Sequence, residues 1–346
     1  MTSPQRITDI VFASDAGFYE GLVAALCSAS FHLPADRPVT FHILDGGIET
    51  NQREHLEQVI SRLGGPGRFR IIPYDASIFR DLPAIRGKSH MTYARLSAPT
   101  IIDAELFLYV DCDVLVFKDL GSFPIVPGQE QVCAGLVDPT YGTMASDLAG
   151  AGLSADEECM PYLNAGVLAV HRENWIAGDI SAKCVEFLRA HPAAQAWDQT
   201  AINHVALHRK RVEPAGEWNR NVTRFSNQVI LESGLEQVFH YVGGAKPWAP
   251  DPAPPESAVG SLIFHRFCRH LFVDAPVPSM PADVSKFGRR VVRKRTEALL
   301  SGGLARARRW KDARVNTRQL QAMATRIDDY LEKHIPHQAL SWPESV

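Results

Sequence analysis

The stretch LFLYVDCDVLV, Leu106–Val116, places two aspartates, Asp111 and Asp113, directly after a strongly apolar run. Leu106–Val110 has the length and composition of a buried strand. Acids two positions apart point to the same side of an extended chain, and burying both unpaired would cost several kcal/mol, ~2 or more each. A hard divalent cation removes this repulsion because it binds carboxylate oxygens. The pair therefore predicts a cation site. The competing interpretation is a pair of acids in a surface turn, which would have the same sequence.

Upstream of this motif, short apolar runs alternate with helical patterns. The predicted strands are Ile10–Ala13, Val39–Leu44 and Phe69–Ile72, and the predicted helices are Glu20–Phe31 and Asn51–Leu63. This alternation is typical of βαβ units, so we expect an α/β fold with a mainly parallel sheet flanked by helices. Ligands of such sheets bind beyond the carboxyl ends of the strands. Asp15 follows the first predicted strand and Asp111 the fourth.

The second half of the chain is less regular. Strands are predicted at Ala134–Val137, Val167–Val170, Val238–Tyr241 and Leu262–His265, helices at Ile180–Ala190 and from Asp198 onward, and a loop at Pro247–Pro255. After about Asp283, arginine and lysine accumulate with apolar residues between them, which predicts basic amphipathic helices over residues 283–346. Such a tail could bind an anionic membrane surface or pack on the rest of the protein.

Composition limits the functional classes. The 346 residues are 45% hydrophobic, enough for one large domain or two smaller ones. A formal net charge of -3 predicts no general attraction to nucleic acid. Absence of an apolar run near ~20 residues or of a secretory signal predicts a cytoplasmic protein. The six scattered cysteines have no zinc-site spacing and are predicted to be small buried hydrophobes.

A second signal is HYVGGAKPW, His240–Trp248. The imidazole of His240 could complete a metal shell with the two aspartates, and a nitrogen ligand favours Mn²⁺ over Mg²⁺. Gly243 lets the backbone approach an anion, and Lys246 can donate to a phosphate. A glycine turn with a solvated lysine is the competing interpretation.

These residues resemble a known group over most of the chain, from about Ile10 to Trp248. The matching blocks follow one another in the family's order: Val11–Asp15, Phe41–Asp45, Thr92–Leu96, Leu108–Asp113, Tyr162–Leu168, Trp197–Gln199 and His240–Trp248. In this order they resemble glycosyltransferase family eight, which holds bacterial lipo-oligosaccharide α-galactosyltransferases, glycogenin and galactinol synthase.

The resemblance implies a GT-A type nucleotide-diphospho-sugar transferase fold. We expect a catalytic domain over residues 1–282, with a nucleotide-binding half at about 1–125 and an acceptor-binding half at about 126–282, followed by the basic segment 283–346. The implied activity is retaining, Mn²⁺-dependent transfer of a hexose, galactose or glucose, from a UDP-sugar to a saccharide or glycolipid acceptor. A glycolipid acceptor would suit a cytoplasmic protein that is peripheral on the inner face of the membrane.

The resemblance also implies a role for each site residue. The metal ligands would be Asp111, Asp113 and His240; Asp15 and Phe18 would lie near the uridine; Arg95 and Asp138 would hold the donor; Asn164 and Asp198 would bind the sugar hydroxyls; Gln199 would lie under the anomeric carbon; and Gly243 and Lys246 would close on the diphosphate. A neutral amide is a poor nucleophile, so we expect front-face attack, with the leaving phosphate taking the acceptor's proton.

Ordinary structural roles compete with some of these assignments. Arg95 could be a surface arginine, Asn164 a turn cap before Gly166, and Asp198 a helix N-cap. Ala16 and Gly17 replace an acid and an asparagine that are frequent in the family, which weakens the nucleoside assignment. Two other functions also remain open. The chain could bind a UDP-sugar without turnover, or it could be a nucleotidyltransferase on a related sheet, although the segment after the first strand lacks that class's lysine.

Overall fold

The computed structural model describes residues 6–84, 89–147, 152–214, 216–222, 227–244, 246–249, 257–275, 293, 296–297, 299–300 and 315–342. The chain divides into two compact units. Unit 1 comprises Met1–Cys112 and Lys118–Asn219, and unit 2 comprises Asp113–Phe117 and Arg220–Val346. The expected boundaries at residues 125 and 282 remain a prediction.

Unit 1 is built on a seven-stranded sheet of order β3-β2-β1-β4-β7-β6-β8. The strands are β1 (Asp9–Ser14), β2 (Val39–Asp45), β3 (Gly67–Pro73), β4 (Leu106–Val110), β6 (Cys133–Val137), β7 (Leu163–His171) and β8 (Lys210–Glu213). The first four in space run parallel, β7 is antiparallel to β4 and to β6, and β6 is parallel to β8. The sheet is thus mixed and mainly parallel, as predicted.

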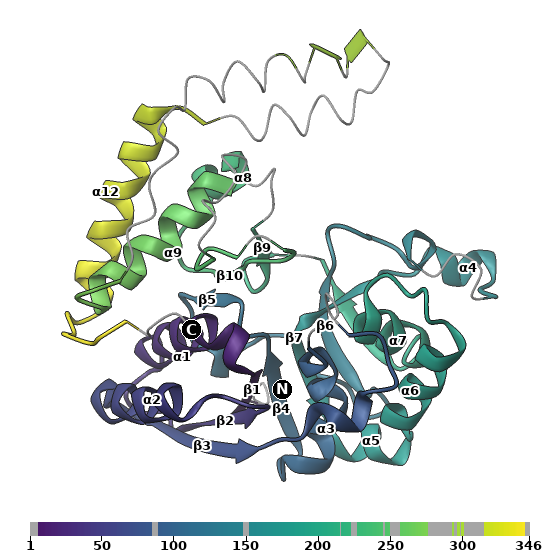
Figure 1. Cartoon of the computed structure of the whole chain (residues 1–346). Coiled ribbons are helices and arrows are strands. Elements are labelled where there is room, and N and C mark those ends of the chain that lie inside the picture. The colour runs from purple at the N-terminus through teal and green to yellow at the C-terminus, as the bar shows by residue number, and fades with distance from the viewer. Residues whose placement is uncertain are drawn as a thin grey trace. The chain divides into compact units, whose positions relative to one another are not determined.

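Helices cover the sheet of unit 1 (Figure 1). They are α1 (Tyr19–Phe31), α2 (Thr50–Leu63), α3 (Ala94–Ile101), α4 (Ala155–Glu158), α5 (Arg172–Ala177), α6 (Ile180–Ala190) and α7 (Trp197–Val205). Short 3-10 turns are Ala16–Phe18, Ala76–Phe79, Met91–Tyr93, Leu120–Ser122 and Met144–Ser146. Side chains of β4 such as Phe107 and Tyr109 share one core with α3, α5, α6 and α7. Because every residue of β4 is buried, both faces of the sheet are covered, which explains the unbroken apolar run.

Local sequence explains where the helices of unit 1 begin and end. At the start of α2, Glu49 and Gln52 form a reciprocal capping box, which satisfies backbone donors that the first turn leaves free. The helix ends at Gly64, whose φ of 60° suits a residue without a side chain. These signals place α2 one residue from its predicted start and at its predicted end.

Unit 2 contains a three-stranded sheet of order β5-β10-β9, and its described residues include the helices α8, α9 and α12. The elements are β5 (Val114–Val116), β9 (Arg220–Asn221), β10 (Val238–His240), α8 (Asn227–Glu232), α9 (Ala258–Leu271) and α12 (Thr317–His334). Strand β10 is antiparallel to β5 and parallel to β9. Phe117, which follows β5, packs against Phe239, Phe267 and Tyr330 and so joins the sheet to α9 and α12.

One predicted element is wrong. Leu262–His265, expected as a strand, lies inside α9. The buried stripe Val259, Ile263, Phe267 and Leu271 has the four-residue spacing of a helix face, and the short apolar window concealed that period.

The remaining expectations concern the basic tail, the proline-rich loop, membrane-spanning helices and the cysteines. Most of the basic residues expected to form a helical tail, between positions 286 and 314, lie outside the described residues, as do positions 250–255 of the predicted proline-rich loop. Within the described part of the chain no helix is long and apolar enough to cross a membrane. All six cysteines carry thiols, and all but Cys159 are buried.

Candidate active site

The two motif aspartates lie in the turn that joins β4 of unit 1 to β5 of unit 2. The backbone N–H of Asp111 donates to the carbonyl of Gly166 on β7 at 2.8 Å. The carbonyl of Asp113 accepts from the N–H of Tyr241, the residue after β10, also at 2.8 Å. Each aspartate is therefore held by backbone pairing within its own unit, with only Cys112 between them in the chain.

Asp113 and His240 come together inside unit 2. His240 ends β10 and pairs with Val114 of β5, so sheet register brings its ring to Asp113. The Asp113 Oδ1 and His240 Nε2 atoms lie 3.1 Å apart, so this buried oxygen faces the imidazole. Two ligands at right angles on one octahedral ion, with bonds of ~2.1 Å, would lie about 3 Å apart. The pair thus has the separation that two ligands of one cation require.

Lys246 supplies the other charge beside Asp113. Its ammonium contacts Asp113 Oδ2 and donates to the carbonyl of Tyr241 at 2.7 Å. Burial alone would raise the pKa of Asp113, but the positive charge of Lys246 and the interaction with His240 outweigh it and hold that pKa below its usual range. Asp113 is accordingly anionic. Gly243, in the same loop, has a φ of 91°, a conformation that side-chain-bearing residues rarely adopt.

In unit 1, Arg95 is the positive charge beside Asp111, as Lys246 is beside Asp113 in unit 2. Its Nη2 lies 2.7 Å from Asp111 Oδ1 and its Nε 2.8 Å from Asp198 Oδ2. A third donor contacts the carbonyl of Ala165. Only 6% of the Arg95 side chain is exposed, so the surface-arginine interpretation is wrong. Because Arg95 and Lys246 each pair with one motif aspartate, the protein itself supplies cations that the charge argument from sequence had assigned to a metal ion.

Asp198 is the second residue of α7 and is almost fully buried. Burial raises its pKa to about 6, although the charge of Arg95 and a hydrogen bond from the Thr92 hydroxyl both lower it. Ala196 is the N-cap of α7, so the alternative of Asp198 as an N-cap is wrong. Asp198 instead belongs to a buried ion pair at the carboxyl end of the sheet.

Asp138, Asn164 and Gln199 form one hydrogen-bonded group in unit 1. Asp138 Oδ2 accepts from Asn164 Nδ2 at 2.7 Å and from Gln199 Nε2 at 3.2 Å. The other end of the Gln199 amide accepts from the backbone N–H of Ala165 at 2.9 Å. The amide of Gln199 is therefore fixed at both ends.

Asn164 is held from two sides as well. Its Oδ1 accepts from the N–H of Gly166 at 3.0 Å and from Asn219 Nδ2 at 2.8 Å. The expected turn-capping contact thus exists, alongside the contact with Asp138. Polar side chains from widely separated parts of the sequence meet here, and a buried network of this kind orients each member.

Asp15 lies at the end of β1, as the pattern predicted. Its Oδ1 accepts from the N–H of Gly17 at 3.1 Å, and its Oδ2 accepts from the Ser89 hydroxyl at 2.6 Å. It caps the short turn Ala16–Phe18, in which Phe18 is half-buried. Their roles toward a nucleoside remain predictions.

Comparison with known proteins decides the family. Residues 9–251 match the model described as glycosyl transferase family 8. The chain belongs to this family. Family 8 membership confirms the resemblance drawn from the sequence blocks and makes the protein a glycosyltransferase by class.

Relatives of this family 8 chain include enzymes that build lipopolysaccharide. The lipopolysaccharide glucosyltransferase WaaO of Escherichia coli is 25% identical, with 69% of this chain and 72% of the relative covered. The lipopolysaccharide 1,3-galactosyltransferase of Salmonella typhimurium is also 25% identical, covering 72% and 75%. The general stress protein A of Bacillus subtilis is 23% identical, covering 72% and 90%.

A solved structure confirms the fold. The galactosyltransferase LgtC, crystallised with donor and acceptor sugar analogs, matches with a TM-score of 0.63 and 26% identity. The match covers 78% of this chain and 98% of LgtC. The mixed sheet flanked by helices is therefore the GT-A type fold that the resemblance implied.

Sequence reasoning on this family 8 chain missed several residues of the site. Thr92, whose hydroxyl contacts Asp198, stands in a quoted block without an assigned role. Asn219 lies outside all the blocks, and its bond to Asn164 spans 55 positions, so no local pattern identifies it. Ser89 precedes a block and carries no signal beyond its polarity.

Proposed function

We propose that this family 8 protein is a retaining hexosyltransferase that moves galactose or glucose from a UDP-sugar to a saccharide or glycolipid acceptor with a divalent ion. The observation that carries the proposal is the pair of Asp113 and His240, whose facing ligand atoms lie 3.1 Å apart. The family resemblance supports Asp111, two positions earlier in the chain, as the third ligand.

The donor set favours a particular ion. Two carboxylates with one imidazole suit Mn²⁺ better than Mg²⁺, which prefers an all-oxygen shell. When bound, such an ion would offset the negative charge of the diphosphate leaving group. Asp113 is anionic in the fold, so no proton has to leave this carboxylate before a cation binds.

Lys246 is placed to act on the same leaving group. It contacts Asp113 through its ammonium group, and its stem lies in a loop whose turn depends on Gly243. With Asp113 engaged by a cation, the Lys246 ammonium would be available to donate to a phosphate oxygen. A charged hydrogen bond of this kind stabilises negative charge that grows as the glycosidic bond breaks.

The fixed amide of Gln199 supports front-face attack. One lone pair of its Oε1 accepts from Ala165, and its Nε2 donates to Asp138. The remaining lone pair of that oxygen can stabilise positive charge at an anomeric carbon without forming a bond. Asp198, the nearby carboxylate that could attack covalently, has its oxygens engaged by Thr92 and Arg95. This arrangement suits a positioning role for Asp198.

The names of the relatives support the substrate class. Two of them are named for transfer of glucose or galactose in lipopolysaccharide, and LgtC was crystallised with sugar analogs at both sites. We accordingly propose galactose or glucose as the donated sugar and a saccharide, free or carried on a lipid, as the acceptor.

A nucleotide-release assay tests the proposal. Purified protein is incubated with Mn²⁺ and, separately, UDP-galactose, UDP-glucose, UDP-N-acetylglucosamine or UDP-N-acetylgalactosamine, and free UDP is measured. We expect UDP release with one of the first two donors, because slow hydrolysis occurs even without an acceptor. Release should depend on added divalent ion and disappear with excess chelator.

Matched variants separate the site from general effects. Asp113→Asn should abolish the metal-dependent release. Asp103→Asn changes the same group where the side chain is 98% exposed and should leave release unchanged. Equal release from both variants would refute the metal-site assignment, and absence of release from the unaltered protein with every donor and acceptor would refute transferase activity. Mass spectrometry of the protein after donor addition should show no glycosyl adduct on Gln199 or Asp198.

A further inference from the structure

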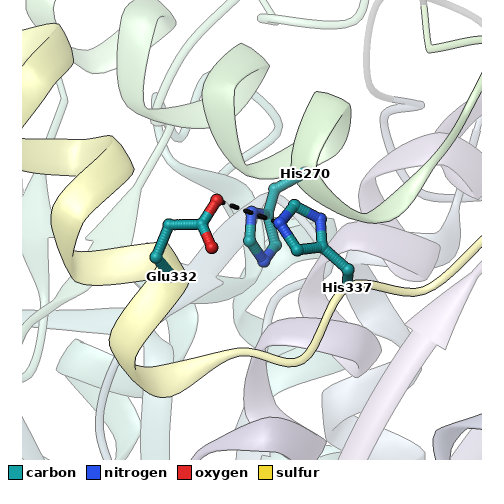
Figure 2. Close-up of side chains that lie close together, drawn as sticks. All are labelled: His270, Glu332 and His337. Carbon is teal, nitrogen blue, oxygen red and sulfur yellow. Dashed lines mark hydrogen bonds and ion pairs between the residues drawn. The ribbon is translucent and has the colours of Figure 1, made fainter.

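A second group of metal-ligating side chains lies in unit 2, formed by His270, Glu332 and His337 (Figure 2). Each offers one ligand atom, and these atoms lie within 4.8 Å of one another. None of the three belongs to the sequence blocks of the family, and the matched region ends at residue 251. The group is therefore separate from the proposed transfer chemistry.

Three segments bring these side chains together. His270 lies in the last turn of α9, Glu332 in the last turn of α12, and His337 in the segment after α12. The two helices lie side by side (Figure 1), and Arg266 of α9 pairs with Asp328 of α12 at 2.9 Å. These contacts fix the backbones on which two of the ligands stand.

The segment after α12 is held against the end of α9 as well. Phe272 and Leu340 form a β-bridge, and the N–H of Val273 donates to the carbonyl of Leu340 at 2.9 Å. His337 lies between the end of α12 and this bridge, so backbone contacts confine its position from both directions.

Hydrogen bonds orient the rings for ligation. The Nε2 of His270 lies 2.8 Å from the backbone carbonyl of Ile335. A carbonyl can only accept, so Nε2 carries the proton and the Nδ1 of a neutral ring keeps its lone pair. A metal-binding histidine commonly has this arrangement, in which its second nitrogen donates to a carbonyl. His337 Nε2 lies 2.9 Å from Glu332 Oε1, and the two rings stack with centroids 4.0 Å apart.

We propose that His270, Glu332 and His337 bind a zinc-class transition-metal ion that ties the segment after α12 to the helix pair α9–α12. Two imidazoles and one carboxylate suit Zn²⁺ and disfavour Mg²⁺ or Ca²⁺, which prefer oxygen. Ligand atoms around a tetrahedral zinc lie about 3.3 Å apart for bonds near 2 Å. Small rotations of the exposed Glu332 and His337 side chains bring the group from its present spacing to that value, and water completes the shell.

The consequence is structural. An ion that binds only the assembled group stabilises the fold by linkage, and the three ligands come from segments separated by up to 67 positions. Binding should protect residues 335–342 in particular, since this segment holds one ligand, although the buried side chains of Ile335, Leu340 and Trp342 also hold it.

A zinc titration of the full-length protein tests the proposal. All proteins carry Asp113→Asn to weaken the other candidate metal group, and metal is first removed with a chelator. Zinc affinity and stoichiometry are then measured by competition with a chromophoric chelator. We expect one tight site, and an affinity at least ~10-fold lower in His337→Ala and in Glu332→Gln, since even loss of an outer-shell contact costs 10–100-fold.

His334→Ala is the matched control. His334 lies on the last turn of α12, is exposed, and stacks on Tyr330 rather than on the group. This variant should bind zinc like its parent. Hydrogen exchange gives a second readout, in which zinc slows exchange over residues 335–342 in the parent but not in His337→Ala. Equal zinc affinity in the parent, the ligand variants and the control would overturn the proposal, as would exchange that zinc leaves unchanged.

Discussion

Replacing Arg95 with alanine should destabilise the protein strongly, and by an amount that depends on pH. Arg95 pairs with Asp111 and with Asp198, and Asp198 has only 3% of its side chain exposed. Removing one partner of a buried pair leaves an unpaired charge and costs about 3–5 kcal/mol. We expect a loss of up to that size in the free energy of unfolding at pH 8, where Asp198 of the parent is ionised and paired with Arg95.

The pH dependence follows from the pKa of Asp198. In the fold this pKa is about 6, above the ~3.9 of an unfolded aspartate. The folded state therefore binds more protons between about pH 4 and pH 6, so stability falls as pH rises through this window. Arg95→Ala removes an interaction that lowers the pKa, so the variant keeps its proton to higher pH. At pH 5 Asp198 is neutral in both proteins, and the cost of the substitution should be smaller by at least about 1 kcal/mol.

Urea unfolding at pH 5 and pH 8, followed by tryptophan fluorescence, measures both values. The same substitution in an Asp198→Asn background is the control, because there the cost of losing Arg95 should lose most of its pH dependence. An identical cost at both pH values in the parent background would refute the buried-charge reasoning.

Three further outcomes follow from the structure, and a fourth follows from the basic sequence of residues 283–346. Lys246→Ala should lower the rate of UDP release ~10²–10³-fold, as loss of a donor to developing charge does, while exposed Lys183→Ala should not. Gly243 has a φ of 91°, so Gly243→Ala should destabilise its loop by about 1–2 kcal/mol and raise the KM for the donor. Gly65→Ala, also at positive φ, is the control and should strain the backbone without changing this KM. Burial lowers the pKa of Lys210 to about 7, so unfolding free energy should rise between about pH 7 and pH 10, and Lys210→Met should remove that slope. Residues 283–346 should make the protein sediment with anionic but not neutral vesicles, and equal recovery in both supernatants would exclude membrane binding.

Local patterns predicted most of the sheet and its helices. The strand Leu106–Val110 and the helix Ile180–Ala190 have the bounds that their apolar periods indicated. Such elements are predictable because their burial is decided by the sheet they belong to and is visible in consecutive residues. The segment Leu262–His265 failed because four apolar residues fit a strand and a buried helix equally well.

The site was predictable only through residue types at strand ends. Asp111 and Asp113 could be identified from the sequence because they follow an apolar run. Their partners could not, because Arg95 lies 16 positions from Asp111 and Lys246 lies 133 positions from Asp113. No periodicity links residues over such distances, so the charge balance of the site had to come from the fold. The same holds for Asn219, which a contact across 55 positions ties to Asn164.

Unit 2 is formed from two separate stretches of the sequence, and this limits which truncated fragments of the protein can be soluble. Its strand β5 is contributed by Asp113–Phe117, which interrupts the sequence of unit 1. A gene truncated after Asn219 would still encode Val114, Leu115 and Val116, now without the strand that pairs with them. An unpaired apolar edge promotes self-association. A soluble minimal fragment would therefore require excision of Asp113–Phe117.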